Sequence, residues 1–398
     1  MKNPLASSRH RRTFVAACFL SPFLAAPLPI ATLAGPLADG DGAPPPQASV
    51  DQAEVAPKWT FSAEAIGLTR QGGVNQTLVA RVPGDVPFYS TSGLDSATYP
   101  GVEALNSNQF RQGFAAGPKF SLTYHDPAGY GLELAYFNVL GLSATKAVGP
   151  DNPADWLVMK APGTFWQTQD FFYQAMAWTD ATSLRSAEAN GRLDLSPRVT
   201  LLAGLRWLQL KDSLQGTLTP ADRTAPGWKQ SPCYDASPLE LLSPECSEYY
   251  PGTKAPGIYP PFWTTSVTND LYGVQIGLAG KLLELGRLSL DGTIKVGLFD
   301  DAAEQSTIVS MKKQLFPSRA ATSHAAFAGE AGLQVKYQLT KGLAVKAGYE
   351  ALWLSGVALA PGQIQETLTT PTSVTALGVN CRSSALFQGG TIGLEYSF

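Results

Sequence analysis

The sequence is poor in charge, histidine and cysteine. Charged residues make up 15% of its 398 residues, compared with about 25% in ordinary soluble proteins. The three histidines are scattered and the four cysteines form no CxxC pair, so neither a zinc site nor another metal or cofactor is expected. The net charge is −3, and no basic patch argues for nucleic acid as a partner.

Long apolar runs are also absent, except at the start of the chain. Lys2 and three arginines precede an apolar stretch over 14–33, which three prolines interrupt before the small-residue site Thr32-Leu33-Ala34. This pattern predicts a cleaved signal peptide over 1–34. Residues 35–57 are rich in Pro, Ala and Gly and are expected to form a linker without a core. No later stretch approaches the ~18 to 20 apolar residues of a spanning helix.

Glycine and aromatic residues are frequent, with 38 glycines and 10% aromatics. The last ten residues show how they are arranged, because Ile392, Leu394, Tyr396 and Phe398 alternate with small or polar residues. A strand with this two-residue period has one wholly apolar face. Nine upstream segments repeat the pattern, most of them roughly nine residues long, the length that a tilted strand needs to cross a bilayer. The ten predicted strands cover 59–65, 114–124, 130–136, 185–195, 199–207, 272–282, 288–298, 327–338, 343–353 and 389–398.

The connections between these strands alternate strictly between short and long. Four are tight, Gly- or Pro-bearing turns at 125–129, 196–198, 283–286 and 340–342. Five are long, at about 69–111, 141–184, 211–266, 300–324 and 355–388. A β-sandwich mixes its loop lengths, whereas an outer-membrane barrel has short periplasmic turns and long outer loops. We therefore predict an all-β chain over 58–398, a transmembrane antiparallel up-and-down β-barrel of about ten strands. The alternative is a barrel of twelve strands, if 165–178 contains another pair of strands.

Aromatic residues support a membrane setting. One group is expected at the short-turn end (Tyr124, Tyr130, Tyr337, Tyr396 and Phe398) and another at the long-loop end (Trp207, Tyr272, Phe327 and Trp353). Two girdles around an aliphatic band suit the two lipid interfaces. The competing interpretation is that these aromatics form the core of an ordinary sandwich.

The residues that alternate with the apolar ones in these strands include charges of both signs, and their side chains would face the lumen. The candidate lumen-lining residues are Lys119, Glu133, Arg206, Asp291, Lys295, Glu330, Lys336, Lys346 and Glu350; Glu64, Glu188, Arg192, Asp194, Lys281 and Glu395 share their parity. Two hypotheses follow. Either cross-strand ion pairs fill the lumen, or the charges line a water-filled pore. Open channels normally have ~16 strands, which favours the filled lumen.

Candidate catalytic residues and a candidate disulfide lie on the long-loop side. Asp300, Asp301 and His324 lie at the ends of neighbouring predicted strands, but no second acid pair accompanies them, so no enzyme is expected. Cys233 and Cys246 lie in the longest outer loop of an exported chain and are expected to form a disulfide. Cys381 is the odd thiol, free or competing for either partner.

Four blocks resemble a family of planctomycete outer-membrane β-barrel porins: 201–208, 269–277, 354–361 and 389–396. The resemblance implies an integral protein of a Gram-negative-type outer membrane and carries no catalytic residue. The chain end also resembles the terminal signal read by the outer-membrane assembly machinery, which assigns Leu394, Tyr396 and Phe398 to assembly. The predicted function is a porin-like channel for passive diffusion of small solutes. The alternative is a non-conducting structural or surface-interaction barrel, with lipid and the assembly machinery as partners and the oligomeric state open.

Overall fold

The computed structural model describes residues 58–83, 101–152, 155–163, 173–220, 261–311, 314–370 and 373–398. The predicted signal peptide (1–34) and linker (35–57) lie outside the described residues, as do Cys233 and Cys246. Among the described residues, no helix is long and apolar enough to cross a membrane.

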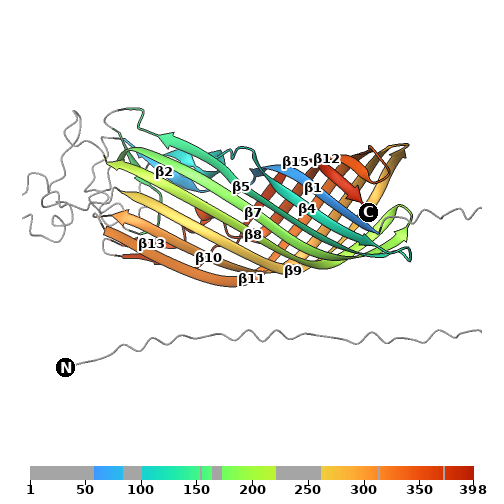
Figure 1. The fold of residues 1–398 in the computed structure, drawn as a ribbon. Coiled ribbons are helices and arrows are strands. Elements are labelled where there is room, and N and C mark those ends of the chain that lie inside the picture. Colours follow the sequence, from blue (N-terminus) through green and yellow to red (C-terminus); the bar gives the residue numbers. More distant parts are fainter. Residues whose placement is uncertain are drawn as a thin grey trace, which may run out of the picture. The chain divides into compact units, whose positions relative to one another are not determined.

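Ten strands of the described chain form a closed antiparallel ring (Figure 1). Each pairs with the next, β7 pairs with β8, and β15 returns to β1, so the ring has no free edge. The fold is therefore the predicted antiparallel up-and-down β-barrel. Its strands are β1 (Trp59–Gln71), β4 (Ala115–His125), β5 (Tyr130–Val148), β7 (Tyr173–Ser196), β8 (Val199–Pro220), β9 (Phe262–Leu285), β10 (Leu288–Met311), β11 (Gln314–Gln338), β12 (Leu343–Val357) and β15 (Ser383–Ser397).

The seam of the ring joins its first and last strands. Thr60 is opposite Ser397, and the register continues to Gln71 opposite Leu386. At the end of the seam the backbone N–H of Trp59 donates to the carbonyl of Phe398 (3.1 Å), and the N–H of Phe398 donates to the carbonyl of Trp59 (2.9 Å). The two ends of the barrel chain thus close the same edge.

The four predicted short turns are all present at one end of the barrel. They join β4 to β5, β7 to β8, β9 to β10 and β11 to β12. Gly129 and Gly286 lie in two of them with φ of +86° and +60°, a conformation that favours glycine. We call this the short-turn end and the opposite end the long-loop end.

One of the five predicted long loops, 300–324, is wrong, and the flanking strands extend into the other four. The predicted loop 300–324 is the end of β10 and the start of β11, separated only by residues 312–313. The inward positions there are Asp301, Ala303, Gln305, Thr307 and Val309, all buried. This buried face mixes polar and apolar side chains. Buried and exposed residues therefore alternate along the strand, but polar and apolar residues do not, and the sequence shows no strand pattern. The strands β7, β9 and β10 reach 24 residues each, about twice the length needed to cross a bilayer.

Smaller elements lie at the long-loop end. The ladder β3–β2–β6–β7 attaches three short strands to the barrel: β2 (Thr77–Val82), β3 (Val102–Asn106) and β6 (Trp156–Met159). A 3-10 turn, η2 (Ser107–Gln109), follows β3. The predicted loop 355–388 contains a second 3-10 turn, η5 (Ala360–Gln363), and a hairpin of β13 (Thr367–Thr370) and β14 (Ser373–Ala376). The twelve-strand alternative requires another pair of strands within 165–178. Residues 173–178 are the start of β7, and residues 165–172 lie outside the described residues.

The outward face next to the short turns is an apolar band. On β9 and β10 it consists of exposed aliphatic residues such as Val274, Ile276 and Ile294. Tyr396 and Phe398 stack at the short-turn edge with ring centroids 5.9 Å apart, and Phe327 meets Trp353 edge-on at 5.5 Å near the other edge. Exposed aliphatic side chains between aromatic edges form the surface that meets lipid in a transmembrane barrel.

Candidate functional site: the barrel lumen

The short-turn half of the lumen contains a polar cavity of about 440 Å³. All nine predicted lumen-lining residues line it: Lys119, Glu133, Arg206, Asp291, Lys295, Glu330, Lys336, Lys346 and Glu350. It reaches the turns, because His125 and Arg198 also line it. We call this cavity the chamber.

Ion pairs across the lumen cover the chamber wall. Lys346 Nζ lies 3.0 Å from Glu64 Oε1 and donates to Ser62 Oγ at 3.0 Å. Lys119 Nζ contacts Glu350 Oε1. Further pairs join Lys336 to Asp291 and Glu395, both at 3.2 Å, and Arg192 to Glu133 at 2.5 Å. The charges therefore neutralise one another instead of presenting one sign to a passing ion.

Four charged side chains with little exposure line the inner part of the chamber, and we call them the charged layer: Glu188, Arg206, Lys295 and Glu330. Arg206 Nη2 lies 2.7 Å from Glu330 Oε2, and Lys295 Nζ lies 2.5 Å from Glu188 Oε1. Gln275 donates to Glu188 Oε2 at 2.5 Å. Buried charges are tolerated only when they are paired and hydrogen-bonded in this way.

Directly beyond the charged layer, the lumen face becomes apolar on every strand of the ring. We call these residues the apolar ring, and none of them is more than 8% exposed: Ile66, Leu68, Ala115, Phe137, Val139, Leu184, Leu208, Leu210, Leu271, Phe299, Ala326, Ala328, Leu352, Leu354, Ala385 and Phe387. They form one packed cluster. The sequence does not predict this ring, because the alternation in the membrane-spanning segments leads one to expect a polar inward face throughout.

A segment of the chain enters the lumen beyond the apolar ring. It lies between β12 and β15 and comprises the described residues 358–370 and 373–382, and we call it the plug. Leu359 packs in the apolar ring, and Ala358, Ala360 and Ile364 are also fully buried. The plug meets β8 and β9 through η5 and meets β11 through β14. The sequence predicted a long outer loop here and left open whether any loop enters the lumen.

The wall around the plug carries a buried polar cluster. Arg70 Nη1 lies 2.6 Å from Asp212 Oδ1 and 3.7 Å from Asp180 Oδ2. Gln112 donates to Asp180 Oδ2 at 3.0 Å. These groups lie beyond the aromatic edge marked by Phe327 and Trp353, outside the membrane-spanning part. Burial, followed by the charge of Asp212, raises the pKa of Asp180 to about 7.

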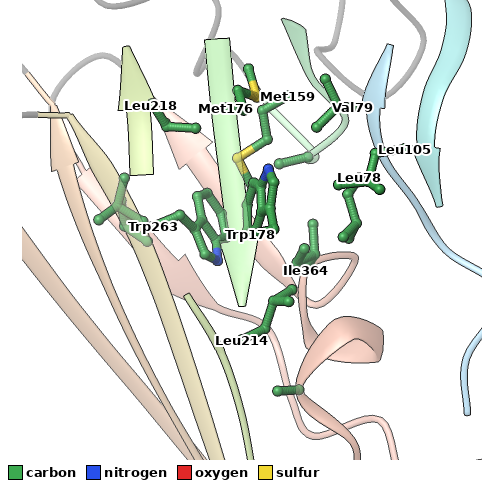
Figure 2. Close-up of a cluster of buried hydrophobic side chains, with 14 of the residues drawn as sticks. Leu78, Val79, Leu105, Met159, Met176, Trp178, Leu214, Leu218, Trp263 and Ile364 are labelled. Atoms are coloured by element: carbon green, nitrogen blue, oxygen red, sulfur yellow. The ribbon is translucent and has the colours of Figure 1, made fainter. Parts of the chain in front are cut away.

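The long-loop end is filled by an apolar core (Figure 2). It brings together Trp178 of β7, Leu214 of β8, Trp263 of β9 and Ile364 of the plug. Leu78, Leu105 and Met159 of the three added strands cover its other side. Packing of this kind is that of a protein interior, not of a water-filled vestibule.

Of the three candidate catalytic residues, Asp301 and His324 lie close together and Asp300 lies apart. Asp301 and His324 are opposite in register, with Nε2 of His324 3.7 Å from Oδ2 of Asp301, and the same nitrogen contacts the carbonyl of Gly356. Asp300 faces outward and accepts from Ser323 Oγ at 2.5 Å. In the part of the chain that the structure describes, no three His, Cys, Asp or Glu side chains are placed to hold a metal.

Cys381 lies on the plug and forms no disulfide with a described residue. Burial, followed by the charge of Asp301, raises the pKa of its thiol to about 11. The thiol is therefore protonated at neutral pH and a poor nucleophile.

No protein-family model matches the sequence, and no curated protein matches it. Solved structures with a similar fold include the outer-membrane protease OmpT from Escherichia coli (TM-score 0.46, 10% identity, 86% of this chain and 98% of that chain covered). Others are the translocator domain of the autotransporter NalP from Neisseria meningitidis (0.36, 8%, 86% and 89%) and a FadL homologue from Pseudomonas aeruginosa (0.28, 11%, 86% and 91%). Likenesses at this level carry no inference about function.

Proposed function

We propose that the protein is an integral outer-membrane β-barrel whose lumen is closed and whose role lies at the cell surface. In this proposal the barrel anchors the long strand extensions and the loops between them. The membrane part holds them in place and conducts no solute. This is the alternative that the sequence left beside a porin-like channel.

The apolar ring is the observation that carries the proposal. All ten strands of the ring contribute to it, and its side chains are buried against one another. An apolar constriction expels water and so blocks ions even without a rigid obstacle. A barrel of this size is also narrow enough for its own side chains to fill it. The charged layer on one side and the plug on the other add two further barriers.

The outer-membrane location is supported by the surface and the connectivity. The outward apolar band lies between aromatic edges, and all the short turns are at one end. Both are features of outer-membrane barrels. Leu394, Tyr396 and Phe398 face outward at the chain end, where the proposed assembly signal lies. Membership of the planctomycete porin family, and a planctomycete source, rest on the four sequence blocks alone.

A porin-like channel for small solutes is the second candidate, and the chamber favours it. Its polar wall and its opening at the turns are what the entrance of a diffusion pathway requires. For conduction, however, the pathway has to continue through both the charged layer and the apolar ring. We propose no catalytic role, because Asp300 and Asp301 lie on opposite faces of β10 and cannot act on one substrate together.

Liposome swelling tests the proposal. Purified full-length protein, shown to be folded by its heat-modifiable gel mobility, is reconstituted with small sugars and amino acids outside. We expect swelling no faster than in empty liposomes, with an open general porin as the positive control. Swelling that scales with the amount of folded protein would favour the channel instead.

A further inference from the structure

The plug is an insertion into a ring that is already complete. The ladder between β12 and β15 continues through Ser355 opposite Ser384 to Val357 opposite Ser383. Residues 358–382 therefore start and end at two directly opposed positions. Their own two strands, β13 and β14, form a separate small sheet. The plug can leave or be removed without breaking any rung of the barrel.

The barrel wall holds the plug by its backbone. Asn269 of β9 binds both peptide groups of Ala358: its Oδ1 accepts from the N–H at 2.7 Å, and its Nδ2 donates to the carbonyl at 2.9 Å. Asp212 Oδ2 accepts from the N–H of Ala360 at 2.8 Å. Further along the plug, Ser318 Oγ accepts from the N–H of Ala376 at 2.5 Å. Two residues two positions apart, Ala358 and Ala360, are thus held through three backbone groups, which is how a protein wall recognises the main chain of a bound peptide.

The wall groups that make these contacts are fixed by other parts of the wall. Asp212 Oδ1 accepts from Arg70 at 2.6 Å and from Thr182 Oγ1 at 2.7 Å, which leaves Oδ2 directed at the plug. Asn269 Nδ2 also donates to the carbonyl of Leu210 at 3.3 Å. A site whose groups are oriented in advance loses little conformational freedom when a ligand binds.

The side-chain requirements of this site are simple. Ala358 and Ala360 are small and flank Leu359, which enters the apolar ring, and Ile364 enters the apolar core. Contacts to the backbone do not depend on the identity of the residue. Selectivity for one peptide sequence over another therefore comes from the small–leucine–small order of residues and from the second aliphatic residue.

We propose that this part of the lumen is a peptide-binding site, occupied in cis by residues 358–364 of the plug. Its ligand is an apolar peptide in which small residues flank a leucine or isoleucine, with an extended backbone at that residue and a 3-10 turn directly after it. The plug is the intramolecular occupant and keeps the site closed until it is displaced. This proposal rests on the proposed surface role, since the site faces the long-loop end, and it names the chemistry of the partner that the barrel receives there.

Binding of a synthetic peptide tests the proposal. The probe is a fluorescent peptide with the sequence of residues 356–366, added to full-length protein in detergent. The variant Leu359→Glu opens the site, because a carboxylate cannot remain fully buried in the apolar ring. We expect saturable binding to Leu359→Glu that is at least tenfold tighter than to the wild-type protein. In the double variant Leu359→Glu/Asn269→Ala, binding should weaken at least tenfold.

Gln209→Ala is the matched control in the Leu359→Glu background. Gln209 donates to Asp270 Oδ1 at 2.8 Å on β9, beside Asn269 in sequence, but neither residue contacts the plug. This control should bind the peptide as Leu359→Glu does. If Leu359→Glu does not fold, a variant with residues 358–382 replaced by a four-residue Gly-Ser turn provides the same open site, since Val357 and Ser383 are opposed.

Three results would overturn the proposal: no saturable binding to a folded open variant, equal binding with and without Asn269, or equal binding to the wild-type protein. None of these results bears on whether the barrel is sealed, because liposome swelling of the wild-type protein measures that separately. Failure of the peptide site and failure of the closed lumen are therefore distinguishable.

Discussion

Asn269 on the barrel wall binds both the N–H and the carbonyl of Ala358 in the plug, at 2.7 and 2.9 Å. Both residues are completely buried, so the peptide groups of Ala358 have no access to water. One wall side chain therefore satisfies a donor and an acceptor that the lumen would otherwise leave unpaired. This pairing allows a loop to replace water inside the barrel.

Asn269→Ala should loosen the plug. The substitution leaves the two peptide groups of Ala358 buried without partners, at a cost of about 1–3 kcal/mol each. Limited proteolysis with thermolysin, followed by mass spectrometry, should show cleavage before Leu359 and Ile364 at least tenfold faster than in the wild-type protein. Gln209→Ala should leave the rate unchanged. Equal protection of the plug in Asn269→Ala would show that it is held by packing alone.

Arg206→Ala should destabilise the whole barrel. Arg206 is buried and lies 2.7 Å from Glu330, whose side chain is only 15% exposed. Removal of Arg206 leaves this carboxylate with only the longer contact to Lys295 Nζ at 3.8 Å. Breaking such a pair costs roughly 3–5 kcal/mol. The temperature at which the folded gel band is lost should fall clearly. Lys281→Ala is the control: its pair with Glu284 at 2.9 Å is exposed and should contribute less than about 1 kcal/mol. Similar melting of the two variants would contradict the buried charged layer.

Asp180 should make the outer part of the barrel less stable as the pH rises. Its pKa is about 7 in the folded chain and 3.8 ordinarily, so the folded state binds the proton more tightly. Stability therefore falls as the pH rises from about 4 to 7. Between pH 5 and pH 8 the wild-type protein should lose on the order of 2 kcal/mol more than Asp180→Asn. Urea titration followed by tryptophan fluorescence measures this difference, and parallel curves for the two proteins would refute it.

Phe398→Ala should impair assembly more than stability. The backbone of Phe398 closes the seam with Trp59, but its side chain is 58% exposed and adds little packing. If it belongs to the assembly signal, the yield of folded protein in the membrane should fall several-fold, while the melting temperature of the assembled fraction stays close to that of the wild-type protein. Leu282→Ala is the control, because this outward residue of β9 is also 58% exposed. A normal membrane yield of Phe398→Ala would contradict the assignment of Phe398 to the assembly signal.

The membrane-spanning part was predictable because its two faces differ in polarity at every position. On β8 the outward Leu205 and Trp207 alternate with the inward Arg206, and such alternation gave the strands, the short turns and the nine lumen-lining residues. Past Trp207 the pattern reverses, because the inward Leu208 and Leu210 are apolar while the outward Gln209 and Lys211 are polar, so the lipid-facing alternation stops there. The strand continues to Pro220.

The plug could not be predicted for a different reason. Pro361 and Gly362 are typical of an exposed loop, yet both are buried. What draws the segment inward is a distant pair of wall residues, Asn269 and Asp212, whose role becomes visible only when the ring has closed. Local sequence patterns carry no information about such long-range pairing.

Single-channel recording in planar lipid bilayers tests the closed lumen most directly. Full-length protein with heat-modifiable mobility, added at increasing amounts and over a range of voltages, should give no discrete conductance steps, because the apolar ring interrupts the water column. Regular steps of uniform size from the folded protein would contradict the closed lumen and show that the barrel is a channel.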